Sequence, residues 1–251
     1  MGRVVAVLNQ KGGVGKTTVT LGLASAGAAA RHRVLIVDLD PQGSSTWVLG
    51  FDPYEVEQST AEVIGGTPIA KAMVPSAWGG EVWLVPASPR LLADDHGGLD
   101  LLALREAIDE VVEQFHAVII DCPPSLGGLS AAALAAADHA IIVVEPSALG
   151  LRGIGAVADL VDEVWDEYNQ DLELAGVVVN KVPPVSTEAD RRYDDLIRSV
   201  GKRAIWQPVI PQRVIVNQAI GERRPVHSYG SRAADIADAF DHLWVRVSRL
   251  N

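Results

Sequence analysis

The chain of 251 residues contains a single cysteine, Cys122, so no internal disulfide can form, which fits a reducing cytoplasm. One thiol also cannot supply the cysteine ligands that an iron–sulfur cluster needs. No apolar run is long enough to span a membrane, and Lys11 and Lys16 interrupt the N-terminal stretch where a signal peptide would lie. Internal repeats and low-complexity tracts are absent too. These absences favour a cytoplasmic globular protein.

Positive charge is scarce overall, with 21 Lys and Arg against 32 Asp and Glu and a net charge of −11. Such a balance is unfavourable for nucleic-acid binding. The distribution is uneven, because residues 1–180 hold 9 basic and 24 acidic side chains, whereas residues 181–251 hold 12 basic and 8 acidic. Either the C-terminal surface helices simply happen to be basic, or they form a basic face suited to phosphate backbones.

The stretch NQKGGVGKTT at residues 9–18 follows an apolar run at 4–8 and precedes a helix-forming segment. A strand, then glycines, then a helix is the context that a phosphate-binding loop requires. The glycines let backbone N–H groups point inward, and the helix that begins near Lys16 adds its positive dipole end. Lys16 is therefore expected to reach the β- and γ-phosphates, and the Thr17 hydroxyl to ligate Mg²⁺. An extra lysine, Lys11, starts the loop, and Gln10 replaces the usual first glycine.

Apolar, β-branched runs alternate with amphipathic segments along the rest of the chain. The pattern predicts an α/β fold with a mostly parallel twisted sheet and helices on both faces, in a single domain over residues 1–251. Further strands are predicted at 33–38, 82–85, 117–121, 140–145 and 174–180, with a short final strand at 205–211. Helices are predicted at 19–30, 89–96, 100–115, 129–137, about 150–165, 187–200 and 230–248, with a short one near 61–64.

Carboxylates stand where two of these strands end, at Asp40 in VDLDPQG (37–43) and at Asp121 in IIDCPPS (119–125). Ligands bind at the C-terminal edge of parallel strands, and a carboxylate after an apolar strand can support Mg²⁺ or its waters. Asp40 has an alternative role as the cap of a helix that starts near Ser44. Cys122 is interpreted as a buried packing residue, because no His or second Cys lies nearby in the sequence.

The loop K-G-G-x-G-K-T-T resembles the deviant Walker A motif of the ParA/MinD family of dimerising ATPases. The sequence DCPPS at 121–125 is similar to that family's switch II, and residues 210–226 resemble its segment I-P-x-x-…-G-x-P-V. The resemblance runs from the strand at Val4 to the helix ending near Val247. Asn9 and Gln10, with DPQG at 40–43, resemble the ParA/Soj branch. The resemblance implies a P-loop NTPase fold.

The resemblance also implies a Mg²⁺-dependent ATPase that binds ATP or ADP, dimerises on ATP and turns over slowly by itself. Lys11 of each subunit would reach the other's phosphate site, Asp40 would position the attacking water, and Asp121 would hold Mg²⁺ through water. Asn180 would read the adenine or, alternatively, only cap its strand. The implied catalytic residues are Lys11, Lys16 and Asp40, and the implied metal site is Thr17 and Asp121 with Asp40 as a further possible ligand. The implied nucleotide-binding residues are Lys11, Gly12, Gly13, Val14, Gly15, Lys16, Thr17, Thr18, Asn180 and Pro211.

A ParA-like chain would move DNA over the nucleoid with a ParB-like or cargo-adaptor partner. No extension precedes the first strand, so a separate N-terminal DNA-binding domain is not expected. The ATP dimer would bind DNA without sequence preference. A MinD-like or orphan spatial regulator that positions protein cargo on nucleoid or membrane is the alternative, although membrane binding is not expected, since the apolar stripe of the last helix is interpreted as core. A metabolic P-loop enzyme acting on a small molecule is a further alternative. The candidate DNA contacts are Arg191, Arg192, Arg213, Arg223 and Arg224.

Overall fold

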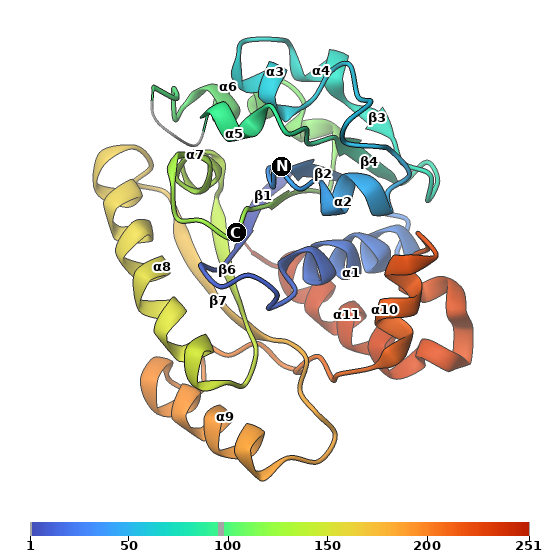
Figure 1. Ribbon diagram of the computed structural model, residues 1–251, viewed down its shortest axis with the longest axis vertical. Coiled ribbons are helices and arrows are strands. Elements are labelled where there is room, and N and C mark those ends of the chain that lie inside the picture. Colours follow the sequence, from blue (N-terminus) through green and yellow to red (C-terminus); the bar gives the residue numbers. More distant parts are fainter. Residues whose placement is uncertain (1, 95–97, 251) are drawn as a thin grey trace.

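The centre of the molecule is a seven-stranded sheet with the strand order β3-β4-β2-β5-β1-β6-β7 (Figure 1). It is seen in a computed structural model that describes residues 2–94 and 98–250. All neighbouring strands pair in parallel except β3, which runs antiparallel to β4 at one edge, so the predicted mostly parallel sheet is confirmed. The strands are β1 (Arg3–Leu8), β2 (Val34–Asp38), β3 (Val74–Pro75), β4 (Val82–Val85), β5 (Ala117–Asp121), β6 (His139–Val144) and β7 (Glu173–Val179).

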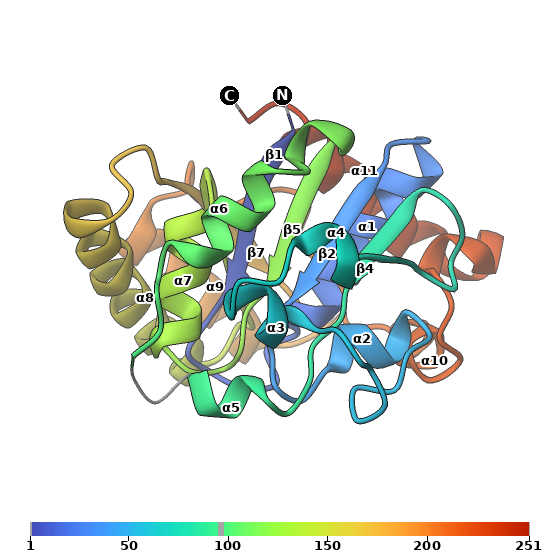
Figure 2. The ribbon, with the colours of Figure 1, turned by 90° about the horizontal axis from the view of Figure 1, so that it is seen from above.

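Helices cover both faces of the sheet, as Figures 1 and 2 show. Two apolar cores result, because alternate residues of each strand point to opposite faces: Val4 and Ala6 belong to one core, Val5 and Val7 to the other. One face carries α1 (Lys16–Ala29), α2 (Ser44–Val48), α10 (Val214–Gly221) and α11 (Ala234–Val247). The other carries α3 (Thr60–Ile64), α4 (Ile69–Ala72), α5 (Leu91–Asp94), α6 (Ala103–Asp109), α7 (Gly128–Ala136), α8 (Ala148–Glu167) and α9 (Thr187–Val200).

Four predicted elements differ from the structure. The helix predicted at 100–115 is only α6 followed by a 3₁₀ turn at Val112–Gln114, because the β-branched pair Val111 and Val112 disfavours a continuous helix where the chain turns into β5. Residues 205–211 form no strand but two isolated bridges, from Val177 to Ile205 and from Val182 to Pro211. Pro208 and Pro211 lack the N–H donors that a ladder needs.

The last helix is shorter than predicted, and its apolar stripe is core. Gly230, with φ of 56°, interrupts the 3₁₀ segment Val226–Ala233, and α11 begins only at Ala234. Phe240, Leu243 and Trp244 are at most 3% exposed and pack in the same core as α1. The alternative that this stripe binds a membrane is therefore wrong. Among the described residues, no helix combines the length and the apolarity that crossing a bilayer requires.

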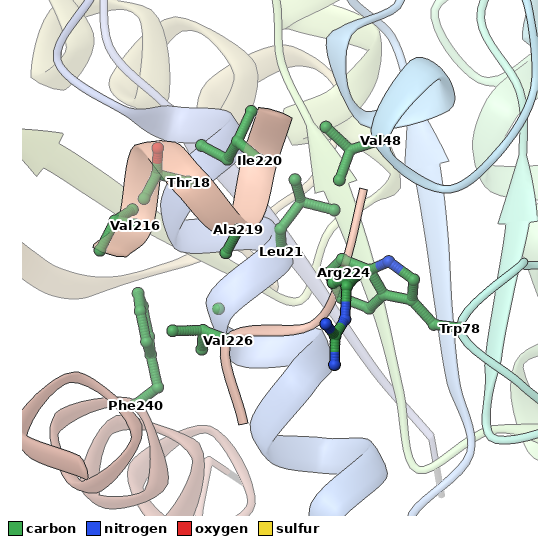
Figure 3. Close-up of a pocket in the computed structure, with 11 residues that line it drawn as sticks. Thr18, Leu21, Val48, Trp78, Val216, Ala219, Ile220, Arg224, Val226 and Phe240 are labelled. Carbon is green, nitrogen blue, oxygen red and sulfur yellow. The ribbon is translucent and has the colours of Figure 1, made fainter. Parts of the chain in front are cut away.

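Several short elements were not predicted: the edge strand β3 and the helices α4 and α10. The helix predicted at 89–96 is the single turn α5, and residues 95–97 lie outside the described part of the chain. Helix α10 packs on α1 through its small residue Ala219 and leaves an apolar cavity of about 20 Å³ beside Leu21, Val216 and Phe240 (Figure 3). That volume holds about one water molecule. Helices α1 and α11 pack against each other on this face of the sheet.

Candidate functional site

The glycine-rich loop at residues 9–15 joins β1 to α1 and has the backbone that glycine alone adopts readily. Gly13 and Gly15 have φ of 79° and 94°, in the left-handed region. A Cβ at Gly15 would also lie 2.2 Å from Nδ2 of Asn180, which donates to the Val14 carbonyl at 2.9 Å. Asn180 follows β7, so the far edge of the sheet holds this loop in place.

Helix α1 presents an open N-terminus to the loop. Its N-cap, Gly15, provides no side-chain hydrogen bond, and no acidic residue lies in the first turn. The first backbone N–H groups and the positive end of the helix dipole are thus available to an anion. Lys16, the first residue of the helix, is only 7% exposed. Burial lowers the pKa of its ammonium, while the nearby carboxylates of Asp121 and Asp40 oppose that shift.

Two buried carboxylates lie side by side at the C-terminal ends of β2 and β5, because Asp38 pairs in register with Asp121. Burial raises the pKa of Asp121 to about 6, against hydrogen bonds from Ser45 and Thr17. Burial and the charge of Asp121 raise the pKa of Asp38 well above its usual range. Ser45 Oγ donates to Asp121 Oδ2 at 2.7 Å, and Asp121 Oδ1 is buried with no hydrogen-bond partner among the described residues.

These residues fit a divalent cation. An orphaned buried carboxylate oxygen needs a cation or water, since an unpaired buried acceptor is costly. The Thr17 side chain forms a hydrogen bond with the same carboxylate. Hydroxyl and carboxylate oxygens are both ligands that Mg²⁺ accepts. The sequence predicted Thr17 and Asp121 as members of such a site, and the fold brings them together.

Asp40 lies on the loop between β2 and α2. Its Oδ1 accepts from the Gln42 N–H at 2.9 Å, and its carbonyl accepts from the Gly43 N–H at 2.7 Å, which makes a tight turn. The alternative that Asp40 caps α2 is wrong, because Gly43 is the N-cap and no side chain caps this helix. Asp38 anchors the turn, since its Oδ2 accepts from both the N–H and the hydroxyl of Thr46.

The Lys11 side chain contacts Glu145, the residue at the start of the β6–α8 connection. Its ammonium forms an ion pair with the carboxylate of Glu145, and its backbone N–H donates to Asn9 Oδ1 at 3.0 Å. Asn9 is fully buried and donates through Nδ2 to the Val143 carbonyl at 2.6 Å. The two lysines of the loop therefore occupy different environments, one buried at the helix N-terminus and one 30% exposed at the rim.

Sequence reasoning missed two charged residues beside this loop. Glu145 holds Lys11, and Lys181, which has a positive φ of 55°, donates through Nζ to the Gly13 carbonyl at 2.5 Å. The available signal was a charged residue close to the end of an apolar strand, directly after β6 for Glu145 and two residues after β7 for Lys181. Pro211 lies near Lys181, where the Gln212 N–H donates to the Val182 carbonyl.

Cys122 is fully buried, and burial together with the Asp121 charge raises the pKa of its thiol far above the usual range. The interpretation of Cys122 as a packing residue is therefore confirmed.

The candidate DNA contacts fall into two groups. Arg191 and Arg192 lie on α9, where Arg192 pairs with Glu188 and Asp195. The other three flank α10, which is well separated from α9 in both ribbon views (Figures 1 and 2). Their contacts are as follows: Arg213 pairs with Asp235 at 2.7 Å, Arg223 stacks on Trp47 at 4.0 Å, and Arg224 lies 3.9 Å from Glu222 and over Tyr229.

The chain is similar to known proteins. A family model described as an AAA domain matches residues 2–174. The sporulation initiation inhibitor protein Soj of Bacillus subtilis is 30% identical over 237 residues, covering 93% of each chain. The chain belongs to the ParA/MinD family of P-loop ATPases.

Two further relatives of this ParA/MinD-family chain have names that describe different functions. The chromosome partitioning protein ParA of Myxococcus xanthus is 30% identical and covers 91% of this chain and 82% of its own. A solved structure of cobyrinic acid a,c-diamide synthase from Mycobacterium smegmatis holds an ATP analog and magnesium. It is 30% identical, has a TM-score of 0.85, and covers 99% of this chain and 95% of that chain. The P-loop fold predicted from the sequence is confirmed.

Proposed function

We propose that this chain is a ParA-type ATPase whose ATP-bound form dimerises, binds DNA without sequence preference, and releases it on hydrolysis. A ParB-like or cargo-adaptor protein would stimulate hydrolysis, and the cycle would segregate DNA on the nucleoid in the cytoplasm. The similarity to Soj and to a ParA supports this proposal.

The separation of the two loop lysines is the observation that carries the proposal. Lys16 is buried at the N-terminus of α1, where it can neutralise phosphates bound by its own loop. The Lys11 side chain is 30% exposed and forms an ion pair with Glu145. We infer that this more exposed ammonium serves the phosphates of a second subunit, which is the logic of a cation supplied in trans.

The remaining residues take roles that follow from their positions. Mg²⁺, held by Thr17 and through water by Asp121, would neutralise charge on the phosphates. Asp40 would orient the attacking water and accept its proton. Its carboxylate lies in a turn that is partly buried, close enough to Lys16 for the two charges to interact. Asn180 and Lys181 donate to backbone carbonyls of the glycine-rich loop. These contacts would keep the N–H groups of the loop directed toward the phosphates.

The basic side chains around α10 and η2 (Val226–Ala233) support DNA binding. Arg213, Arg223, Arg224 and Arg232 gather here, while Glu222 and Asp235 offset part of their charge. A dimer doubles this charge, and affinity for DNA rises with the number of phosphates neutralised.

Small-molecule ligation is a second candidate, favoured by the similarity to cobyrinic acid a,c-diamide synthase. It predicts turnover that a small carboxylic acid stimulates and that does not depend on a dimer. The MinD-like alternative predicts binding to anionic lipid in place of DNA.

Lys11→Ala tests the role given to the rim lysine. The variant should retain binding of a fluorescent ATP analogue and lose the ATP-dependent dimer measured by light scattering. Lys202→Ala, an exposed lysine far from the loop in the sequence, is the matched control. An unchanged ATP-dependent dimer in Lys11→Ala would remove Lys11 from the switch and overturn the proposal.

Co-sedimentation separates the candidates. Protein with ATP or with ADP is spun with plasmid DNA or with vesicles of anionic lipid. ATP-dependent pelleting with DNA alone supports the ParA-type function, pelleting with vesicles alone supports the MinD-like one, and neither, together with acid-stimulated turnover, supports ligation.

A further inference from the structure

Glu145 is the first residue after β6, and its carboxylate is oriented by its own turn. The Ser147 N–H donates to the Glu145 carbonyl at 2.8 Å, and Ser147 Oγ lies 3.4 Å from Glu145 Oε1. The same Oε1 accepts from the Lys11 ammonium. The two side chains are 25% and 30% exposed, so the ion pair is accessible from solvent.

The same β6–α8 connection also holds the backbone of Lys11. Asn9 links the Lys11 N–H to the Val143 carbonyl through its two side-chain atoms. A Cβ at Gly153, in the second turn of α8, would lie 2.6 Å from Asn9 Oδ1, so the helix packs directly on this link. Main chain and side chain of Lys11 are therefore fixed by one segment, residues 143–153.

A free carboxylate beside a loop that binds polyphosphate would repel the ligand. Here Lys11 neutralises the charge of Glu145, and the ammonium of Lys11 is therefore paired within its own subunit. A partner's polyphosphate carries more negative charge than one carboxylate and competes for the same ammonium.

We propose that Glu145 is a positioning residue that holds Lys11 in its own subunit until two ATP-bound subunits meet. Breaking the Lys11–Glu145 ion pair is then a cost of dimerisation, and Glu145 sets how much protein and ATP the dimer needs. This inference rests on the proposed function, because it requires Lys11 to act in trans.

Amine labelling tests the ion pair in the nucleotide-free protein without relying on a dimer. The chain has only five lysines, at 11, 16, 71, 181 and 202, so mass spectrometry can follow each one. Glu145→Gln should raise the labelling rate of Lys11 at least about twofold relative to Lys202, since exposed ion pairs shift equilibria by about this factor. Glu145→Asp should restore slow labelling, and Glu167→Gln, an exposed carboxylate at the end of α8, should leave it unchanged.

Dimerisation tests the release step. Because the dimer breaks two ion pairs, each worth about a two- to fivefold effect, Glu145→Gln should lower the dissociation constant of the ATP dimer about four- to twenty-five-fold. Glu145→Asp should return it toward the wild-type value.

The two measurements distinguish the possible failures. Unchanged Lys11 labelling in Glu145→Gln, or an ATP dimer as weak as wild type or weaker, overturns the role of Glu145 while leaving the proposed function in place. A wild-type protein that forms no ATP dimer overturns the proposed function itself, and with it the release step.

Discussion

At the scale of single residues, the carboxylate of Asp40 offers the sharpest test of the chemistry. Asp40→Asn keeps an oxygen that can accept from the Gln42 N–H, and so preserves the turn, but removes the charge that would take a proton from water. We expect ATP turnover to fall about 100-fold or more, because a general base contributes about 10²–10⁴-fold. Phosphate release under saturating ATP measures this, and light scattering should still detect the ATP dimer.

Asp52→Asn is the matched control for this substitution. Asp52 also accepts from an N–H two residues on, that of Tyr54 at 2.9 Å, in an exposed turn. Its turnover should equal that of the wild type. Normal turnover in Asp40→Asn would show that Asp40 has no catalytic role.

The residues that could be predicted from the sequence are those inside a local motif. Lys16 and Thr17 belong to a motif that directly follows the strand β1, and Asp121 is the last residue of the strand β5. Each could therefore be located from its neighbours in the sequence. Glu145 and Lys181 could not be linked to the loop in this way, because their partners Lys11 and Gly13 lie 134 and 168 residues away. Only the strand order, with β6 beside β1 and β7 beside β6, brings them to the loop.

At the scale of elements, the contact between α1 and α11 is tight enough to test by one methyl group. A Cβ at Gly22 would lie 2.2 Å from two atoms of the Phe240 ring, and that ring is 1% exposed. Gly22→Ala should therefore lower the free energy of unfolding by about 1–3 kcal/mol through overpacking. Urea unfolding followed by circular dichroism measures the change.

Gly155→Ala on α8 is the opposite case. Nothing lies within 4 Å of a Cβ at this exposed helical position. Alanine should stabilise the helix there by about 0.5–1 kcal/mol, since glycine is the poorer helix former. If Gly22→Ala were as stable as Gly155→Ala, the close packing of α1 on α11 would be incorrect.

Element prediction succeeded where an apolar run was long and failed where it was short or broken. The buried strands β1, β2, β5 and β6 have continuous β-branched sequences. The edge strand β3 has two residues, and its pairing depends on β4 rather than on its own sequence. Residues 205–211 looked like a strand by composition, but prolines limit their pairing to isolated bridges.

At the scale of the whole molecule, the acidic body and the more basic C-terminal third define how the protein would meet DNA. Arg223 and Arg224 follow α10, which packs on the same face of the sheet as α1 and α11. They are better candidates than Arg213, because Arg213 pairs with Asp235 at 2.7 Å, more closely than Arg224 pairs with Glu222 at 3.9 Å. Binding through phosphates should weaken steeply with salt and show no sequence preference.

Replacing Arg223 and Arg224 together by Ala should weaken ATP-dependent binding to plasmid DNA. It should also reduce the slope of log affinity against log salt by about 1 for each phosphate that is no longer neutralised, hence by about 2–4 in a dimer. Binding is measured by mobility shift at several salt concentrations with ATP. Arg105→Ala, on α6 and the opposite face of the sheet, should change neither affinity nor slope. If the double variant kept the wild-type slope and Arg191→Ala lowered it, the DNA surface would lie on α9 and the assignment to α10 would be wrong.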